Sequence, residues 1–170
     1  FCTLRVFYAW AVQRRHIVAS PAATLKTPTR PKPQPKALTI GQVRQLLAYL
    51  ASEKGCMARR DECLITTAIY AGLRAQELAQ LRWVDIDLDS GIITIPISKA
   101  NHGRRIPVHP CLLRLLKGWI EQCDPDDDEA PVFACSRGHN RGQALSPNSV
   151  GKISRRVRKA SGVKFTTHAL

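Results

Sequence analysis

The chain has 170 residues, with 26 Lys or Arg against 13 Asp or Glu, so its formal net charge is +13. Five of the acids lie in the run 124–129, and none lies between residue 130 and residue 170. This length suffices for one domain with its own core. A basic excess this uneven favours a polyanion partner, most simply nucleic acid. The alternative is a basic protein without a specific polyanion.

Several classes of protein are excluded by what the sequence lacks. It shows no secretory signal pattern and no apolar run near the ~20 residues that cross a bilayer, so we expect a cytoplasmic protein without membrane contact. The six cysteines form no Cys-x-x-Cys pair, and Cys135 and His139 have no partner pair at zinc-ligand spacing. We therefore expect neither a metal nor another cofactor. The sequence opens on Phe1 rather than Met, and we expect a fragment.

The first two segments differ sharply in composition. Residues 1–18 are predicted to be helical, because apolar side chains recur there at helical spacing, and they suit the last helix of an upstream domain. Residues 19–37 contain five prolines and four basic residues without an acid, which predicts an extended, semi-rigid linker. Such a linker either follows a phosphate backbone or is a solvated tether.

A new domain is predicted over residues 38–170. Thr39 and Gln42 match a capping box at the start of a helix. A second helix is expected over residues 60–71, and Gly72 breaks it before a short third helix. A further helix is expected to begin at Pro110, which suits a first helical position.

Residues 84–108 change to a period of two. Apolar residues alternate with polar ones over 84–88, 92–97 and 104–108, which predicts a three-stranded antiparallel meander. Pro107 suggests an edge strand or a strand end. The fold class predicted is therefore mainly α with a small three-stranded antiparallel β-sheet (α+β).

The predicted helix over residues 146–161 is strongly two-sided. An apolar side is formed by Val150, Ile153, Val157 and Ala160, and the opposite side is basic and free of acids. Like charges on one face repel, and DNA phosphates would relieve that repulsion. The alternative is a solvated face. The basic residues are Lys152, Arg155, Arg156, Arg158 and Lys159.

Three residues that are far apart in the sequence are candidates for a chemical role. Arg74 follows the helix break at Gly72 and precedes Glu77 by three residues. Lys99 lies in the predicted hairpin loop, and His168 lies near residue 170. Taken singly, each has an ordinary structural interpretation: an ion pair, a soluble loop lysine, or a structural histidine.

Taken together and in this order, these segments resemble the tyrosine recombinase (phage integrase) family over about residues 38–170. Residues 7–11 and 20–21 also resemble the end of that family's helical core-binding domain and its exit to the linker. The motifs that carry the resemblance are Ala71-Gly72-Leu73-Arg74-Ala75-Gln76-Glu77-Leu78, then Lys99 with Arg104 and Pro107, and Thr167-His168-Ala169-Leu170.

The resemblance implies metal-free and ATP-free strand exchange, in which a tyrosine attacks the scissile phosphate and forms a 3′-phosphotyrosyl link. Arg74 would be one of two arginines that bind the nonbridging oxygens. Lys99 would protonate the leaving 5′-oxygen, and His168 would assist proton transfer. Fixed cations suit a transition state that gains negative charge. Glu77 is interpreted as structural, orienting Arg74 or its helix.

The resemblance also implies partners and an organisation. We expect double-stranded DNA as the partner and a homo-tetramer on synapsed DNA for the full-length parent, in a bacterial, nucleoid-associated setting. Residues 1–18 would end the core-binding domain, 19–37 form the linker, and 38–170 a truncated catalytic domain. The residues expected to bind nucleic acid are Arg104, Arg105, Lys152, Arg155, Arg156 and Lys159.

One departure from the family pattern leaves two interpretations open. The family's second arginine, its later His or Trp and its nucleophile have no match up to Leu170, and Tyr8, Tyr49 and Tyr70 lie in the wrong elements. The chain is then either part of a site-specific recombinase or a non-catalytic DNA-binding remnant of a mobile-element integrase. Type IB topoisomerases share the active-site logic, but the short hairpin favours the integrase side.

We predict that this 170-residue chain binds duplex DNA weakly and forms no covalent adduct with it. The reason is that none of its tyrosines matches the family's nucleophile. A nicked suicide substrate, followed by denaturing electrophoresis, checks this directly. A trapped phosphotyrosyl complex would show the prediction to be wrong.

Overall fold

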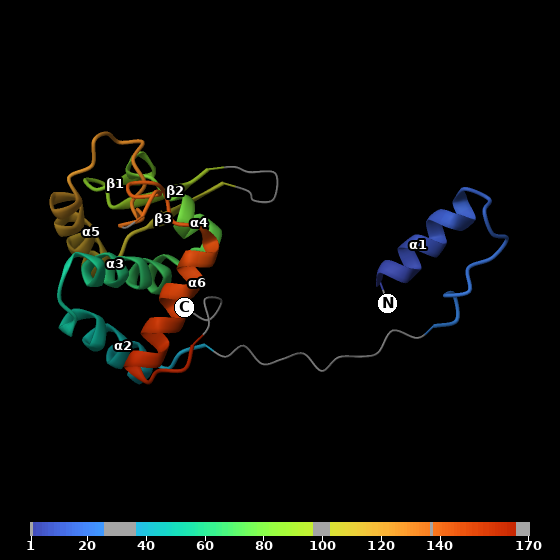
Figure 1. The fold of residues 1–170 in the computed structure, drawn as a ribbon, viewed down its shortest axis with the longest axis horizontal. Coiled ribbons are helices and arrows are strands. Elements are labelled where there is room, and N and C mark those ends of the chain that lie inside the picture. Colours follow the sequence, from blue (N-terminus) through green and yellow to red (C-terminus); the bar gives the residue numbers. More distant parts are fainter. Residues whose placement is uncertain (1, 26–36, 97–102, 137, 166–170) are drawn as a thin grey trace. The chain divides into compact units, whose positions relative to one another are not determined.

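The computed structural model describes residues 2–25, 37–96, 103–136 and 138–165 (Figure 1). Lys99, His168 and most of the predicted linker therefore lie outside the described residues. The chain divides into two compact units, Phe1–Gln34 and Pro35–Leu170.

The first unit contains helix α1, Cys2–Gln13, which is shorter than the helix expected over 1–18. The helix ends early because Arg15 takes a left-handed backbone conformation, with φ of 57°. Trp10 then lies with its ring 5.3 Å from that of His16 and 5.9 Å from that of Phe7. The assignment of this helix to a core-binding domain stays a prediction.

The second unit begins with helices α2, Ile40–Ser52, and α3, Cys56–Ala71. The predicted capping box is confirmed: the Gln42 amide donates to Thr39 Oγ1 at 3.3 Å, and the Thr39 amide donates to Gln42 Oε1 at 2.9 Å. Helix α3 begins about a turn earlier than expected, directly after Gly55.

The predicted meander is present, with shorter strands. Residues Trp83–Asp85 form a 3-10 helix, η1, and the strands are β1, Ile86–Asp87, β2, Ile92–Ile95, and β3, Arg104–Pro107. They form an antiparallel sheet in the order β1-β2-β3. The fold class, mainly α with a small three-stranded sheet, is confirmed, and Pro107 lies at the end of edge strand β3, as the sequence predicts.

Two capped helices follow the sheet: α5, Pro110–Cys123, and α6, Pro147–Ser161. On α6 the predicted apolar side is wrong at one position, since Ala160 is exposed while Ser161 is buried. The carbonyl of Ser161 accepts a hydrogen bond from Gln45 Nε2 at 3.1 Å. This contact with α2 turns the last residue of α6 inward and leaves Ala160 on the outside.

The core of the second unit lies around α3, which packs against α2 and α5, while α6 packs against α4 and α2 (Figure 1). Its centre consists of side chains without any exposed surface. Those of the helices and the sheet include Leu46, Leu64, Ile65, Ile93, Leu112, Leu116 and Val150. Phe133, from the loop after α5, is buried with them.

The acidic run 124–129 lies on this loop, and its side chains are exposed as expected. Its backbone, however, is held. The Val84 amide donates to the Asp128 carbonyl at 2.6 Å, and the Trp83 amide donates to the Ala130 carbonyl at 3.1 Å. Arg82 also pairs with Glu129. The loop is thus fastened to the segment that leads into β1.

Two isoleucines give a matched test of this packing. Ile93 is fully buried in β2, whereas Ile40, at the start of α2, is 73% exposed. We expect Ile93→Ala to lower the free energy of unfolding by about 2–5 kcal/mol, through lost burial and a cavity. Ile40→Ala should change it by less than about 0.5 kcal/mol. Urea unfolding followed by circular dichroism measures both, and equal effects would contradict the assigned core.

Candidate active site and nucleic-acid interface

Arg74 stands at the junction of two helices. Helix α3 ends at Gly72, which is left-handed with φ of 61° and whose amide donates to the Ala68 carbonyl at 3.1 Å. Glycine adopts this conformation without steric cost, which allows the chain to turn sharply. Leu73 is then buried, and Arg74 is the extended N-cap residue of α4, Ala75–Gln80. The buried Leu73 on one side and the first turn of α4 on the other hold the backbone of Arg74.

Glu77, on the first turn of α4, binds three groups of the described residues through its carboxylate. Its Oε2 accepts from the backbone amide of Arg74 at 2.8 Å, and its Oε1 accepts from Arg74 Nη1 at 3.1 Å. Arg104, in β3, donates from Nη1 to Oε1 and from Nη2 to Oε2, both at 2.8 Å. The carboxylate therefore joins the start of α4, the Arg74 side chain and the edge strand.

These contacts hold Glu77 in its charged form. The Arg104 guanidinium, followed by the Arg74 amide and side chain, lowers the pKa of Glu77 to about 2, although burial acts in the opposite direction. The Glu77 side chain is only 11% exposed. A buried carboxylate is stabilised when hydrogen-bond donors and opposite charges satisfy it. Glu77 is thus the structural partner of Arg74, as the sequence indicates.

The Arg74 side chain itself remains largely outside. It is 67% exposed, with one of its nitrogens on Glu77. A guanidinium offers five donors in a planar fork, so the remaining donors can bind two oxygens of a phosphate. Lys99 and His168, which the family resemblance would place beside it, lie outside the described residues. Their roles stay predictions.

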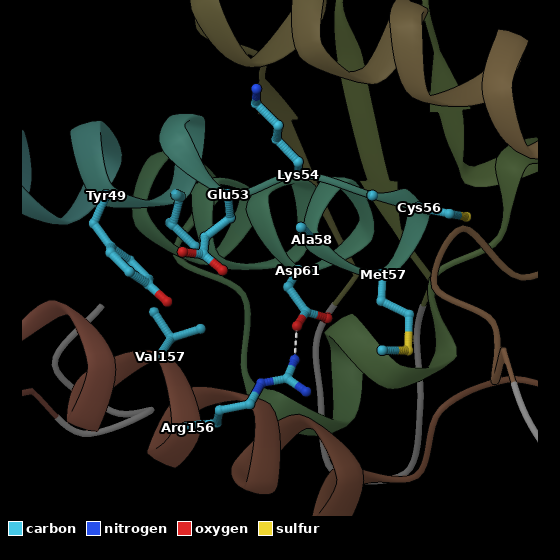
Figure 2. Close-up of a pocket in the computed structure, with 11 residues that line it drawn as sticks. Tyr49, Glu53, Lys54, Cys56, Met57, Ala58, Asp61, Arg156 and Val157 are labelled. Atoms are coloured by element: carbon cyan, nitrogen blue, oxygen red, sulfur yellow. Dashed lines mark hydrogen bonds and ion pairs between the residues drawn. The ribbon is translucent and has the colours of Figure 1, made fainter.

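The basic side of α6 divides into two groups. Lys152, Arg155, Arg158 and Lys159 are exposed. Arg156 is also exposed over 55% of its side chain, but it pairs with Asp61 of α3. Figure 2 shows Arg156 reaching Asp61 across a pocket of about 530 Å³, with Tyr49 and Met57 in its walls.

Asp61 is a buried carboxylate for which the sequence gives no functional signal. Its Oδ1 accepts from Nε and Nη2 of the neighbouring Arg60 at 3.2 and 3.0 Å. Arg60 Nη1 in turn donates to the Ala134 carbonyl at 3.0 Å and to Ser136 Oγ at 3.2 Å. Burial lowers the pKa of Arg60. An Arg-Asp pair inside an otherwise ordinary amphipathic helix gives no sequence signal that its partners lie on distant segments.

Two further features of the described residues bear on function. Within them, no group of three or more His, Cys, Asp or Glu side chains is arranged to hold a metal ion. No helix in the same ranges is both long and apolar enough to cross a membrane.

Comparison with known proteins gives a consistent result. The phage integrase family matches residues 36–170. Tyrosine recombinase XerA of Pyrococcus furiosus is 32% identical over 149 residues, covering 88% of this chain and 50% of XerA. Tyrosine recombinase XerC of Xanthomonas axonopodis pv. citri is 35% identical over 115 residues, covering 68% and 37%. A lambda integrase tetramer bound to a Holliday junction is similar in fold, with a TM-score of 0.70 at 21% identity, covering 95% of this chain and 47% of that one.

The helical domain with its small three-stranded sheet thus has the fold of an integrase. The chain belongs to the phage integrase family. It spans half or less of the length of these two curated relatives.

The pKa of Glu77 predicts a specific acid sensitivity. Because folding lowers this pKa from 4.5 to about 2, the charged carboxylate stabilises the fold fully above pH 4.5. That contribution is lost as the pH falls from 4.5 toward 2. We expect Glu77→Gln to lower the free energy of unfolding at pH 7 by on the order of 1–2 kcal/mol. The free energy of unfolding of this variant should also fall less steeply between pH 4.5 and 2. Urea unfolding at several pH values measures it.

Glu121→Gln, which removes an exposed carboxylate from α5, is the control for this experiment. Its stability profile should follow that of the unaltered protein. If Glu77→Gln lost stability between pH 4.5 and 2 as steeply as the unaltered protein, this would contradict the charged state of the partly buried Glu77.

Proposed function

We propose that this chain is the DNA-binding and partial catalytic region of a tyrosine recombinase that breaks and rejoins DNA at specific sites. The observation that carries this proposal is the arrangement of Arg74. Its backbone is fixed at a helix junction, one nitrogen is held by Glu77, and its side chain is 67% exposed. An arginine held in this way is preorganised for a phosphate without losing its remaining donors.

In the proposed reaction, Arg74 binds nonbridging oxygens of the scissile phosphate and stabilises the charge that develops on them. A tyrosine oxygen bonds to phosphorus, and the bond to the 5′-oxygen breaks. The tyrosine gives up its hydroxyl proton as the new bond forms, and the leaving oxygen takes a proton from Lys99. His168 assists proton transfer at the phosphate or at the tyrosine. Attack by the 5′-hydroxyl of a second DNA strand reverses these steps, so the phosphodiester is restored without ATP or metal.

The proposed DNA-binding surface consists of basic side chains that form no ion pair with a carboxylate of the described residues. On α6 these are Lys152, Arg155 and Lys159, all exposed, and on β3 the exposed Arg105. Helix α6 packs directly against α4, whose N-terminus carries Arg74. A phosphate backbone that crosses α6 would therefore pass near the start of α4. Arg156, although predicted to bind DNA, is paired with Asp61 in the free protein.

The proposed assembly follows from the relatives. The lambda integrase similar in fold forms a tetramer on a Holliday junction. By analogy, the full-length parent would act as a homo-tetramer on two synapsed duplexes in the cytoplasm, with residues 1–18 ending a core-binding domain and 19–37 crossing between domains. In the full-length parent, each active site would then bind double-stranded DNA.

Salt dependence tests the DNA-binding surface. Each phosphate contact that is lost should reduce the slope of log affinity against log salt by roughly 0.9. We expect the triple variant Lys152→Ala, Arg155→Ala, Lys159→Ala, which loses three contacts, to lose roughly 2.7 units of slope and to weaken binding similarly for unrelated duplexes. Fluorescence anisotropy with a labelled duplex at 50–300 mM salt (an estimated working range) measures this.

The matched control removes the same net charge elsewhere. Arg44, Lys54 and Lys117 are exposed basic residues on α2, the α2–α3 connection and α5. Their simultaneous change to alanine should leave the slope nearly intact. If the two triple variants lost equal slope, DNA binding would depend on net charge alone, which would contradict the assigned surface.

A further inference from the structure

Arg104 is bound differently from its neighbour on the same strand. Both of its terminal nitrogens donate to Glu77, each at 2.8 Å, and its side chain is 33% exposed. Arg105 follows it in β3, with its side chain exposed. Successive side chains of a strand point to opposite faces of the sheet, so the two arginines face different surroundings. Only one of them meets the carboxylate beside Arg74.

Arg104 lies at the end of the β2–β3 ladder, so its contact with Glu77 can hold that end of the sheet in place. Arg104 pairs with Ile95, and these residues form the last rung of the β2–β3 ladder before residues 97–102, where Lys99 lies in the sequence. Strand β3 is an edge strand, so the sheet supports it from one side only. Glu77 supplies the second support from α4, across a sequence separation of 27 residues.

The geometry of the contact also makes Arg104 a poor phosphate ligand. A guanidinium recognises a carboxylate or a phosphate through the same two-pronged edge. The prongs of Arg104 already occupy both oxygens of Glu77. Releasing them to DNA would leave a carboxylate that is only 11% exposed without its strongest partner, which is costly.

We propose that Arg104 is a positioning residue: through Glu77 it fastens the end of the β2–β3 hairpin to the N-terminus of α4 and to Arg74, and it does not bind DNA phosphate. This inference rests on the proposed function of Arg74 and Lys99, and it replaces the DNA-contact role that the sequence alone assigns to Arg104. This contact between Glu77 and Arg104, here called the lock, would fix the point at which strand β3 begins, five residues after Lys99 in the sequence.

Salt-dependent binding of a labelled duplex separates the two roles. For Arg104→Gln we expect a change of less than about threefold in affinity and an unchanged salt slope, because no phosphate contact is lost. Arg105→Gln, the matched neighbour, should reduce the slope by roughly one unit. A slope that falls in Arg104→Gln as much as in Arg105→Gln would overturn the proposal.

Two spectroscopic readouts test the lock itself. The carboxyl 13C signal of Glu77 should titrate near its ordinary range in Arg104→Gln, remain low in Arg105→Gln, and be partly restored in Arg104→Lys, which keeps the charge but loses the fork. Amide exchange at Ile95 should quicken by about tenfold or more in Arg104→Gln, whereas that at Ile93, deeper in the sheet, should not. An unshifted Glu77 signal or unchanged exchange at Ile95 would overturn the proposal.

These outcomes are distinct from a failure of the proposed function. If the unaltered chain bound DNA without salt dependence, the proposed function would fail, while the Glu77 titration and the exchange at Ile95 would still decide the lock. General unfolding of Arg104→Gln would show as fast exchange at both Ile93 and Ile95. In that case Arg104→Lys, with its smaller disturbance, decides: no recovery of the Glu77 signal counts against the lock.

Discussion

The ion pair between Glu77 and Arg104 is the contact on which the geometry of the candidate site depends. A carboxylate that is 11% exposed is tolerated in a protein only if charged or polar partners surround it. Here the partners come from the start of α4, from Arg74 and from strand β3. Satisfying one buried charge therefore brings together a helix end and a hairpin that separate stretches of the chain provide.

Asp61 has a similar role between α3 and α6. It lies on α3, the central helix, and it holds Arg60 of its own helix and Arg156 of α6. Carboxylates on α4 and α3 thus each secure an arginine from a later segment. The basic residues of this protein consequently serve two purposes. Some pair with acids of the interior and fix the arrangement of the helices, and others, such as Lys152 and Lys159, stay exposed on the surface proposed to bind DNA.

Local signals made most of the fold predictable. The capping box at Thr39, the glycine break at Gly72 and the alternating apolar residues of the meander each act within a few residues, and all are present. The long-range ion pairs were not predictable, because Glu77 and Arg104 are 27 residues apart and Asp61 and Arg156 are 95 apart. A pattern of charges along a chain does not reveal which of them meet in space. For the same reason the sequence did not separate Arg104 and Arg156, which pair with acids, from basic residues that are simply exposed, and their contacts with DNA stay predictions.

The fastened acidic loop has a consequence for how the domain meets its partner. Hydrogen bonds from Trp83 and Val84 fix the backbone of this loop, so its five carboxylates stay at one place on the surface. In Figure 1, α5, directly after which this run begins, lies on the left of the unit, whereas α6 lies on its right. The domain therefore carries a permanent charge asymmetry. The field of a polyanion would exert a torque on this charge dipole and would turn α6 toward the polyanion before the two make contact. The asymmetry would therefore raise the rate of productive encounter more than the affinity of the complex.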